Sequence, residues 1–252
     1  MEWNNKDHSF CESKLLGIPE YLNSISSILI SCFGWYGLFN TPNADIFIDT
    51  INSLIIILGI GSVGYHWTGN IGWGLMDEFP MILGITVGTL YVDYIYRILN
   101  PYFTSYFKLE VLFYLAGVVL FLVVNGMSKY RYSFPENFGL LASILLYKII
   151  RLLGIIKIDK RKEIIGKIIF SVFTIISSVI IWSFTEKLCD YFNSYILLIG
   201  HPLWHLSIGF GFYNLIQCMY FIKLDNEFPN FYKLIYNKYL LFNLIFSDNI
   251  NP

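Results

Sequence analysis

Charged side chains are scarce in this sequence. Asp, Glu, Lys and Arg together make up 14% of the 252 residues, whereas apolar residues make up 56%. Soluble globular domains differ from this balance, because about 25% of their residues are charged. The net charge is only −1, so the chain also lacks the basic face with which nucleic-acid-binding proteins hold phosphates. The composition therefore argues against a soluble domain and against a nucleic-acid partner.

Other common features are missing as well. The sequence shows no low-complexity tract, convincing internal repeat or linker, which favours a single domain over residues 1–252. Its N-terminus carries charges of both signs and lacks the basic start, short apolar run and small-residue cleavage site of a removable signal peptide. We therefore expect the first apolar segment to remain in the mature protein.

Long apolar segments, in contrast, are abundant. Crossing a bilayer as a helix takes about 20 residues, and seven segments are long enough: residues 21–40, 51–68, 75–99, 109–127, 136–156, 163–184 and 194–222. A membrane β-barrel would instead alternate apolar and polar residues in strands of about 10 residues, and segments such as 111–124 do not alternate. The sequence predicts an all-α bundle of seven transmembrane helices in a multi-pass membrane protein.

The basic residues indicate how this bundle is oriented. Seven of the 17 lie within residues 148–167, in or beside the connection between the fifth and sixth segments, and such clusters face the cytoplasm. With seven spans, 12 basic residues fall on that side and 5 on the other. We expect an exoplasmic N-terminal segment at residues 1–20 and a cytoplasmic tail at residues 223–252. Topology and contact with lipid headgroups explain the cluster without a specific ligand.

Histidine is rare, yet three of the four histidines fall within predicted spans: His66, His201 and His205. An imidazole in hydrocarbon is costly without a partner, so an ionisable residue at membrane depth is a functional candidate. His201 and His205 are four residues apart, which places them on one helix face, suitable for one metal ion. The predicted helix directions bring the three histidines and Asp77 together in the exoplasmic half of the bundle.

A zinc ion on three imidazoles keeps one position for water, as catalytic zinc does, whereas structural zinc sites are closed. Such an ion lowers the pKa of water toward about 7. Asp77 is suited to accept the proton of that water, although it could instead cap the third helix. Ser62, one turn before His66, is suited to hydrogen-bond a carbonyl oxygen or an oxyanion, although it could instead serve helix packing between Gly61 and Gly64.

Three short motifs carry a family resemblance: Gly59-Ile60-Gly61-Ser62-Val63-Gly64-Tyr65-His66-Trp67-Thr68, Leu75-Met76-Asp77-Glu78-Phe79-Pro80-Met81 and His201-Pro202-Leu203-Trp204-His205. In this order of Ser, His, Asp, His and His, the sequence resembles the alkaline ceramidase family, from Phe10-Cys11-Glu12 through the seventh span. The resemblance implies zinc on the three histidines, proton transfer by Asp77 and oxyanion stabilisation by Ser62. It also implies hydrolysis of the amide bond of ceramide to sphingosine and a fatty acid, in the endoplasmic reticulum or Golgi.

Two alternatives stay open. The wider superfamily contains receptors and lipid-remodelling proteins that share much of the metal constellation, and fold likeness does not fix a substrate. The chain could therefore act on a phospholipid or a glycosylphosphatidylinositol anchor, or it could be receptor-like with a structural zinc. Ser62 and Asp77 favour an enzyme, because a structural zinc needs neither an oxyanion donor nor a base. The sequence does not identify protein partners.

The resemblance departs from the family at a calcium site. The family has an Asp-Trp-Cys-Glu-x-Asn run and a later Glu, whereas this chain has Ser9-Phe10-Cys11-Glu12-Ser13-Lys14. Glu12 and Glu20 match two of the family's ligands. Ser9 and Lys14, however, replace a carboxylate and an amide, and calcium needs about six to eight oxygen ligands. We therefore predict weak or absent calcium binding, with the Lys14 ammonium partly filling the place of the cation between the two carboxylates.

Cysteine is also rare, with four residues in the chain. The predicted topology places Cys11 and Cys189 on the exoplasmic side, which is oxidising, and the resembling family carries cysteines at matching positions. A Cys11–Cys189 disulfide is the resulting hypothesis. Cys32 and Cys218 fall within predicted spans, where we expect them to be packing residues.

Overall fold

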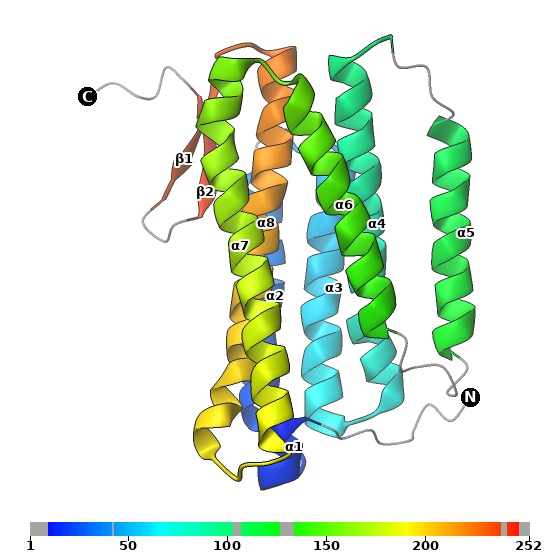
Figure 1. The fold of residues 1–252 in the computed structure, drawn as a ribbon, viewed down its shortest axis with the longest axis vertical. Coiled ribbons are helices and arrows are strands. Elements are labelled where there is room, and N and C mark those ends of the chain that lie inside the picture. Colours follow the sequence, from blue (N-terminus) through cyan, green and yellow to red (C-terminus); the bar gives the residue numbers. More distant parts are fainter. Residues whose placement is uncertain (1–9, 42, 103–106, 127–133, 238–240, 247–252) are drawn as a thin grey trace.

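The computed structural model describes residues 10–41, 43–102, 107–126, 134–237 and 241–246, which form a helical bundle (Figure 1). A 3₁₀ segment at Tyr195–Ile199 precedes the last helix, and the helices are α1 (Cys11–Leu16), α2 (Tyr21–Asn40), α3 (Ile46–Thr68), α4 (Ile71–Leu99), α5 (Phe107–Gly126), α6 (Phe134–Ile155), α7 (Ile158–Cys189) and α8 (Gly200–Glu227). Among the described residues, six helices are long and apolar enough to cross a membrane. The predicted helical fold class is confirmed, and the orientation of the bundle stays a prediction.

The seven predicted spans correspond to α2 through α8. The first one coincides with α2, and the fourth corresponds to α5, whose predicted end, Met127, lies outside the described residues. Several helices begin before the predicted span, because hydrogen bonds to the first backbone N–H groups, rather than hydropathy, set where a helix starts. In α3, for example, Asp45 Oδ1 accepts the backbone N–H of Phe47 and that of Ile48, each at 3.1 Å. Hydropathy alone does not detect such a cap.

The helices pack side by side around an apolar interior. α2 lies against α3 and α8, α3 against α4, α4 against α6, and α7 against α8, while α5 stands at one edge beside α4 (Figure 1). A buried apolar cluster joins α3, α4, α6 and α8 and includes Ile48, Tyr91, Leu152 and Tyr220. Large apolar side chains such as Phe113 and Phe173 are also exposed on the outside. This exterior suits contact with lipid rather than with water.

A β-hairpin lies against α8 on the side of the bundle, in the half away from α1 (Figure 1). β1 (Tyr232–Tyr236) pairs antiparallel with β2 (Phe242–Phe246). Asn214 Oδ1 of α8 accepts the backbone N–H of Phe242 at 2.9 Å, and the Tyr213 hydroxyl donates to the Phe242 carbonyl at 3.1 Å. These residues belong to the predicted tail at 223–252, and the hairpin was not predicted because two five-residue strands give little periodic signal.

The turn between α3 and α4 sets the start of α4. Gly69 follows α3 in the left-handed conformation, with φ 67°, which glycine adopts at little cost. Asn70 caps α4, since its Oδ1 accepts the backbone N–H of Gly72 at 2.8 Å. Asp77 consequently lies in the second turn of α4 rather than at its N-terminus. The alternative that Asp77 caps this helix is therefore wrong.

Candidate metal centre

Three buried histidines meet near the end of the bundle that carries α1. His66 lies in the last turn of α3, and His201 and His205 lie in the first two turns of α8. One ring nitrogen of each lies within 4.8 Å of the other two, and no other group of His, Cys, Asp and Glu atoms in the described part of the chain is gathered closely enough to hold a metal ion. The histidines that the sequence analysis expected to converge do lie together.

Glu20 orients the first of these imidazoles. Its Oε2 lies 2.6 Å from His66 Nδ1 and accepts from Asn23 Nδ2 at 3.0 Å, and Glu20 and His66 are both buried. Burial raises the pKa of the Glu20 carboxyl, but the hydrogen bonds from His66 and Asn23 outweigh burial and hold that pKa below its ordinary value. A carboxylate only accepts, so His66 Nδ1 carries the proton and Nε2 keeps a lone pair for a metal.

His205 has a hydroxyl as its outer partner. Its Nδ1 lies 2.8 Å from Ser26 Oγ, and the Ser26 hydroxyl donates to the backbone carbonyl of Asn23 at 3.0 Å. Because that proton of Ser26 is already engaged, Nδ1–H of His205 donates to Ser26 Oγ. Nε2 of His205 is then also left for a metal.

His201 is bonded to a carboxylate that the sequence analysis did not identify. Its Nδ1 lies 3.1 Å from Glu186 Oε1, on α7. The donor set therefore fits zinc, because three imidazoles are gathered and each can present Nε2 while its Nδ1 is bonded to an oxygen. Glu186 could have been noticed as an ionisable residue at the end of an apolar segment, three residues before Cys189.

Ser62 lies within the same polar network. It is buried on α3, and its Oγ lies 3.0 Å from Ser27 Oγ, which in turn lies 3.3 Å from His205 Nδ1. The Ser62 hydroxyl is thus linked through Ser27 to the Nδ1 side of His205. Gly61 and Gly64 contact α4, and the hydrogen bond from Ser27 to Ser62 joins α2 to α3. Ser62 therefore contributes to helix packing, and its catalytic role stays a proposal.

Asp77 is placed by a close approach between α3 and α4. A Cβ on Gly61 would lie 2.3 Å from the Met76 carbonyl oxygen and 2.7 Å from the Asp77 backbone nitrogen, so only glycine allows this contact. The backbone of Asp77 therefore lies against α3 at the residue next to Ser62. Its carboxylate is not part of the histidine group of possible metal ligands within the described residues, and its role stays a proposal.

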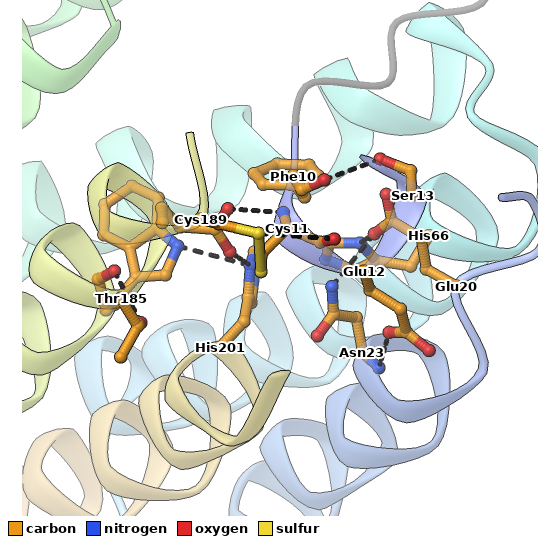
Figure 2. A network of polar contacts seen from close by, with 12 residues as sticks. Phe10, Cys11, Glu12, Ser13, Glu20, Asn23, His66, Thr185, Cys189 and His201 are labelled. Atoms are coloured by element: carbon orange, nitrogen blue, oxygen red, sulfur yellow. Dashed lines mark hydrogen bonds and ion pairs between the residues drawn. A yellow bond between two sulfur atoms is a disulfide. The ribbon is translucent and has the colours of Figure 1, made fainter. Parts of the chain in front are cut away.

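An aromatic ring and a disulfide hold the N-terminal segment over the histidines. The Phe10 ring centroid lies 4.7 Å from that of His201 and 5.1 Å from that of His66. Cys11 is bonded to Cys189, so the predicted disulfide is present, and Figure 2 shows it beside His201. The N-terminal segment is thus tied to the end of α7, next to the metal ligands.

The two carboxylates of the expected calcium site have other partners. Glu12 Oε1 accepts the backbone N–H of Leu22 at 2.8 Å and Oε2 that of Asn23 at 2.9 Å, so Glu12 caps α2, while Glu20 contacts His66 (Figure 2). Lys14 Nζ lies 2.5 Å from Asp190 Oδ1. The expectation that Lys14 lies between the two carboxylates is therefore wrong. Ser9 lies outside the described residues.

We expect calcium to change neither hydrolysis nor thermal stability. Calcium would have to displace backbone N–H groups from Glu12 and the imidazole from Glu20, and Lys14 offers it no oxygen. The measurement is a calcium titration from micromolar to millimolar, followed by activity and by scanning fluorimetry. Strong stimulation at micromolar calcium would contradict this. Glu12→Gln serves as a companion variant, since the loss of one cap acceptor destabilises the fold by about 1 kcal/mol at any calcium concentration.

Long apolar helices around a buried group of three histidines define a helical membrane protein with a candidate metal centre. A comparison with family models extends this conclusion, because the model of the family described as Ceramidase matches residues 5–245. The chain therefore belongs to the Ceramidase family. Membership implies a hydrolase that acts on amide bonds and a lipid substrate. The comparison with curated proteins gives no match.

Proposed function

We propose that this chain hydrolyses the amide bond of ceramide to sphingosine and a fatty acid, with zinc held by His66, His201 and His205. The observation that carries the proposal is the gathering of these buried imidazoles in a chain of the Ceramidase family. As the alkaline ceramidase resemblance implies, we place this reaction in the membrane of the endoplasmic reticulum or Golgi.

Each residue of the site has a chemical role in this proposal. A zinc ion on the three imidazoles would supply a Lewis acid for the amide carbonyl and would make water more acidic. Asp77 accepts a proton from the attacking water as the C–O bond forms, and returns it to the departing amine as the C–N bond breaks. The Ser62 hydroxyl donates a hydrogen bond to the carbonyl oxygen while negative charge develops there.

Apolar cavities next to the site support a lipid substrate. One of about 70 Å³ lies between α3, α4, α6 and α8, and Leu58, Pro80 and Met81 are part of its lining. Pro80 and Met81 lie one turn beyond Asp77, so this cavity begins close to the proposed base. A second cavity of about 190 Å³ shares Ile85 and Phe212 with the first. Together they offer an apolar environment for a hydrocarbon chain.

A substrate panel tests the proposal. We expect purified protein to release sphingosine from ceramide, to lose this activity after treatment with a zinc chelator, and to regain it with added zinc but not with calcium. Ester-linked phospholipids and simple N-acyl amines serve as competing substrates, and a calcium-selective chelator is the control. Cleavage of phospholipid with ceramide left intact would contradict the assignment, and so would full zinc occupancy without hydrolysis of any lipid.

A further inference from the structure

Two side chains compete for the same nitrogen of His201. Its Nδ1 lies 3.1 Å from Glu186 Oε1 and 3.2 Å from Trp182 Nε1, and all three residues lie on α7 or at the start of α8. A carboxylate only accepts a hydrogen bond, whereas an indole N–H only donates one. The two contacts therefore need opposite tautomers of the imidazole. With Glu186 the proton is on Nδ1, and with Trp182 it is on Nε2.

Only one of these tautomers can bind a metal through Nε2, because a protonated Nε2 has no lone pair to donate. We propose that Glu186 is a positioning residue that selects the metal-binding tautomer of His201 against the competing Trp182 N–H. This inference rests on the metal site of the proposed function. It adds to that site a carboxylate that decides whether one of the three ligands is available.

The surroundings of Glu186 keep its carboxylate in place. Its Oε2 accepts the backbone N–H of Cys11 at 2.6 Å, and the disulfide joins Cys11 to Cys189, less than one turn after Glu186 on the same helix. With Oε2 held in this way, Oε1 stays directed at His201. The side chain of Glu186 is 16% exposed and that of His201 6%, so little water competes for the hydrogen bond between them.

Trp182 also has a packing partner that keeps its ring in place. Its ring stacks on Trp204 of α8 with centroids 5.4 Å apart. Loss of the Glu186 carboxylate would consequently leave an indole N–H in position to bond His201 Nδ1. The proton of the imidazole would then be on Nε2, and zinc would have to displace it.

Zinc affinity of the full-length protein, measured by competition with a chromophoric chelator, tests this inference without reference to activity. We expect Glu186→Ala to weaken zinc binding about 10- to 100-fold, the usual effect of losing an outer carboxylate. Glu186→Gln, with one acceptor oxygen for two N–H donors, is expected to lose less. Trp182→Phe in the Glu186→Ala background should recover part of the loss, because the competing donor is gone. The absorption spectrum of the cobalt-loaded proteins reports the coordination independently.

Asp190→Asn is the matched control, since it removes a nearby carboxylate that pairs with Lys14 rather than with a histidine. It should bind zinc like the parent. Parental affinity, within about threefold, in Glu186→Ala would overturn the inference, and so would a double variant no better than Glu186→Ala. If Glu186→Ala does not fold, Glu186→Gln with and without Trp182→Phe gives the same comparison.

The outcomes also separate this inference from the proposed function. If the parent protein binds no zinc, both the proposed function and the proposed role of Glu186 are contradicted. A parent that binds zinc but leaves ceramide intact contradicts the substrate, while the effect of Glu186 on zinc affinity still stands. Hydrolysis of ceramide together with equal zinc affinity in all variants contradicts only the role of Glu186.

Discussion

His205→Ala is expected to lower zinc affinity more than about 1,000-fold and to reduce amide hydrolysis to background, because two imidazoles cannot hold the ion as three do. The substitution also leaves the buried Ser26 hydroxyl without the ring nitrogen that now lies 2.8 Å away. The measurements are metal content by mass spectrometry and sphingosine release from ceramide. Metal content and sphingosine release should fall together, since His205 holds the zinc on which hydrolysis depends.

Leu203→Ala is the matched control for this variant. Leu203 lies between His201 and His205 on α8, and its side chain is exposed on the outside of the bundle. Its truncation should leave zinc content and hydrolysis close to those of the parent. Hydrolysis at the parental rate in His205→Ala would show that the histidine group is not the reaction centre.

Asp77→Asn is expected to slow hydrolysis about 100- to 10,000-fold while zinc stays bound, because the amide has the shape of the carboxylate but cannot accept a proton. The zinc content should not change, since the carboxylate is not in the histidine group. Measuring turnover and metal content on the same preparation separates the two effects.

Asp49→Asn is the corresponding control, because Asp49 lies in the first turn of α3, at the end opposite His66. It should retain parental turnover. Loss of zinc from Asp77→Asn would contradict the assigned role and would point to metal binding or a structural role instead. Unchanged turnover would exclude Asp77 as the base.

Much of the site could be predicted because its signals are local. His201 and His205 are four residues apart on one helix, and imidazoles are rare within apolar segments. The seven long helices follow from hydropathy, with the bounds of α2 predicted to the residue, whereas the short α1 and the first residues of several long helices were not predicted. The pairing of Cys11 with Cys189 followed from their placement on one side of the membrane and from the family resemblance.

The rest depends on contacts between distant segments, which one sequence does not encode in readable form. Glu12 and Glu20 match a calcium site by residue type, yet a carboxylate oxygen accepts an N–H group as readily as it binds a cation. In this structure the backbone N–H groups of α2 occupy the oxygens of Glu12, and His66 occupies an oxygen of Glu20, so neither carboxylate is reserved for a cation. Lys14 likewise has its partner 176 residues away, in Asp190. Such pairings become visible only once the helices are placed side by side.

The position of the ligands along the chain has a consequence for biosynthesis. His66 emerges from the ribosome early, whereas His201 and His205 belong to the last long helix. A nascent chain that stops before α8 carries one of the three imidazoles, so metal loading on all three must follow the synthesis of α8. The cysteine cross-link between residues 11 and 189 obeys the same order. The metal site therefore forms only when α8 packs against α3, and translation products that lack α8 should contain no bound metal.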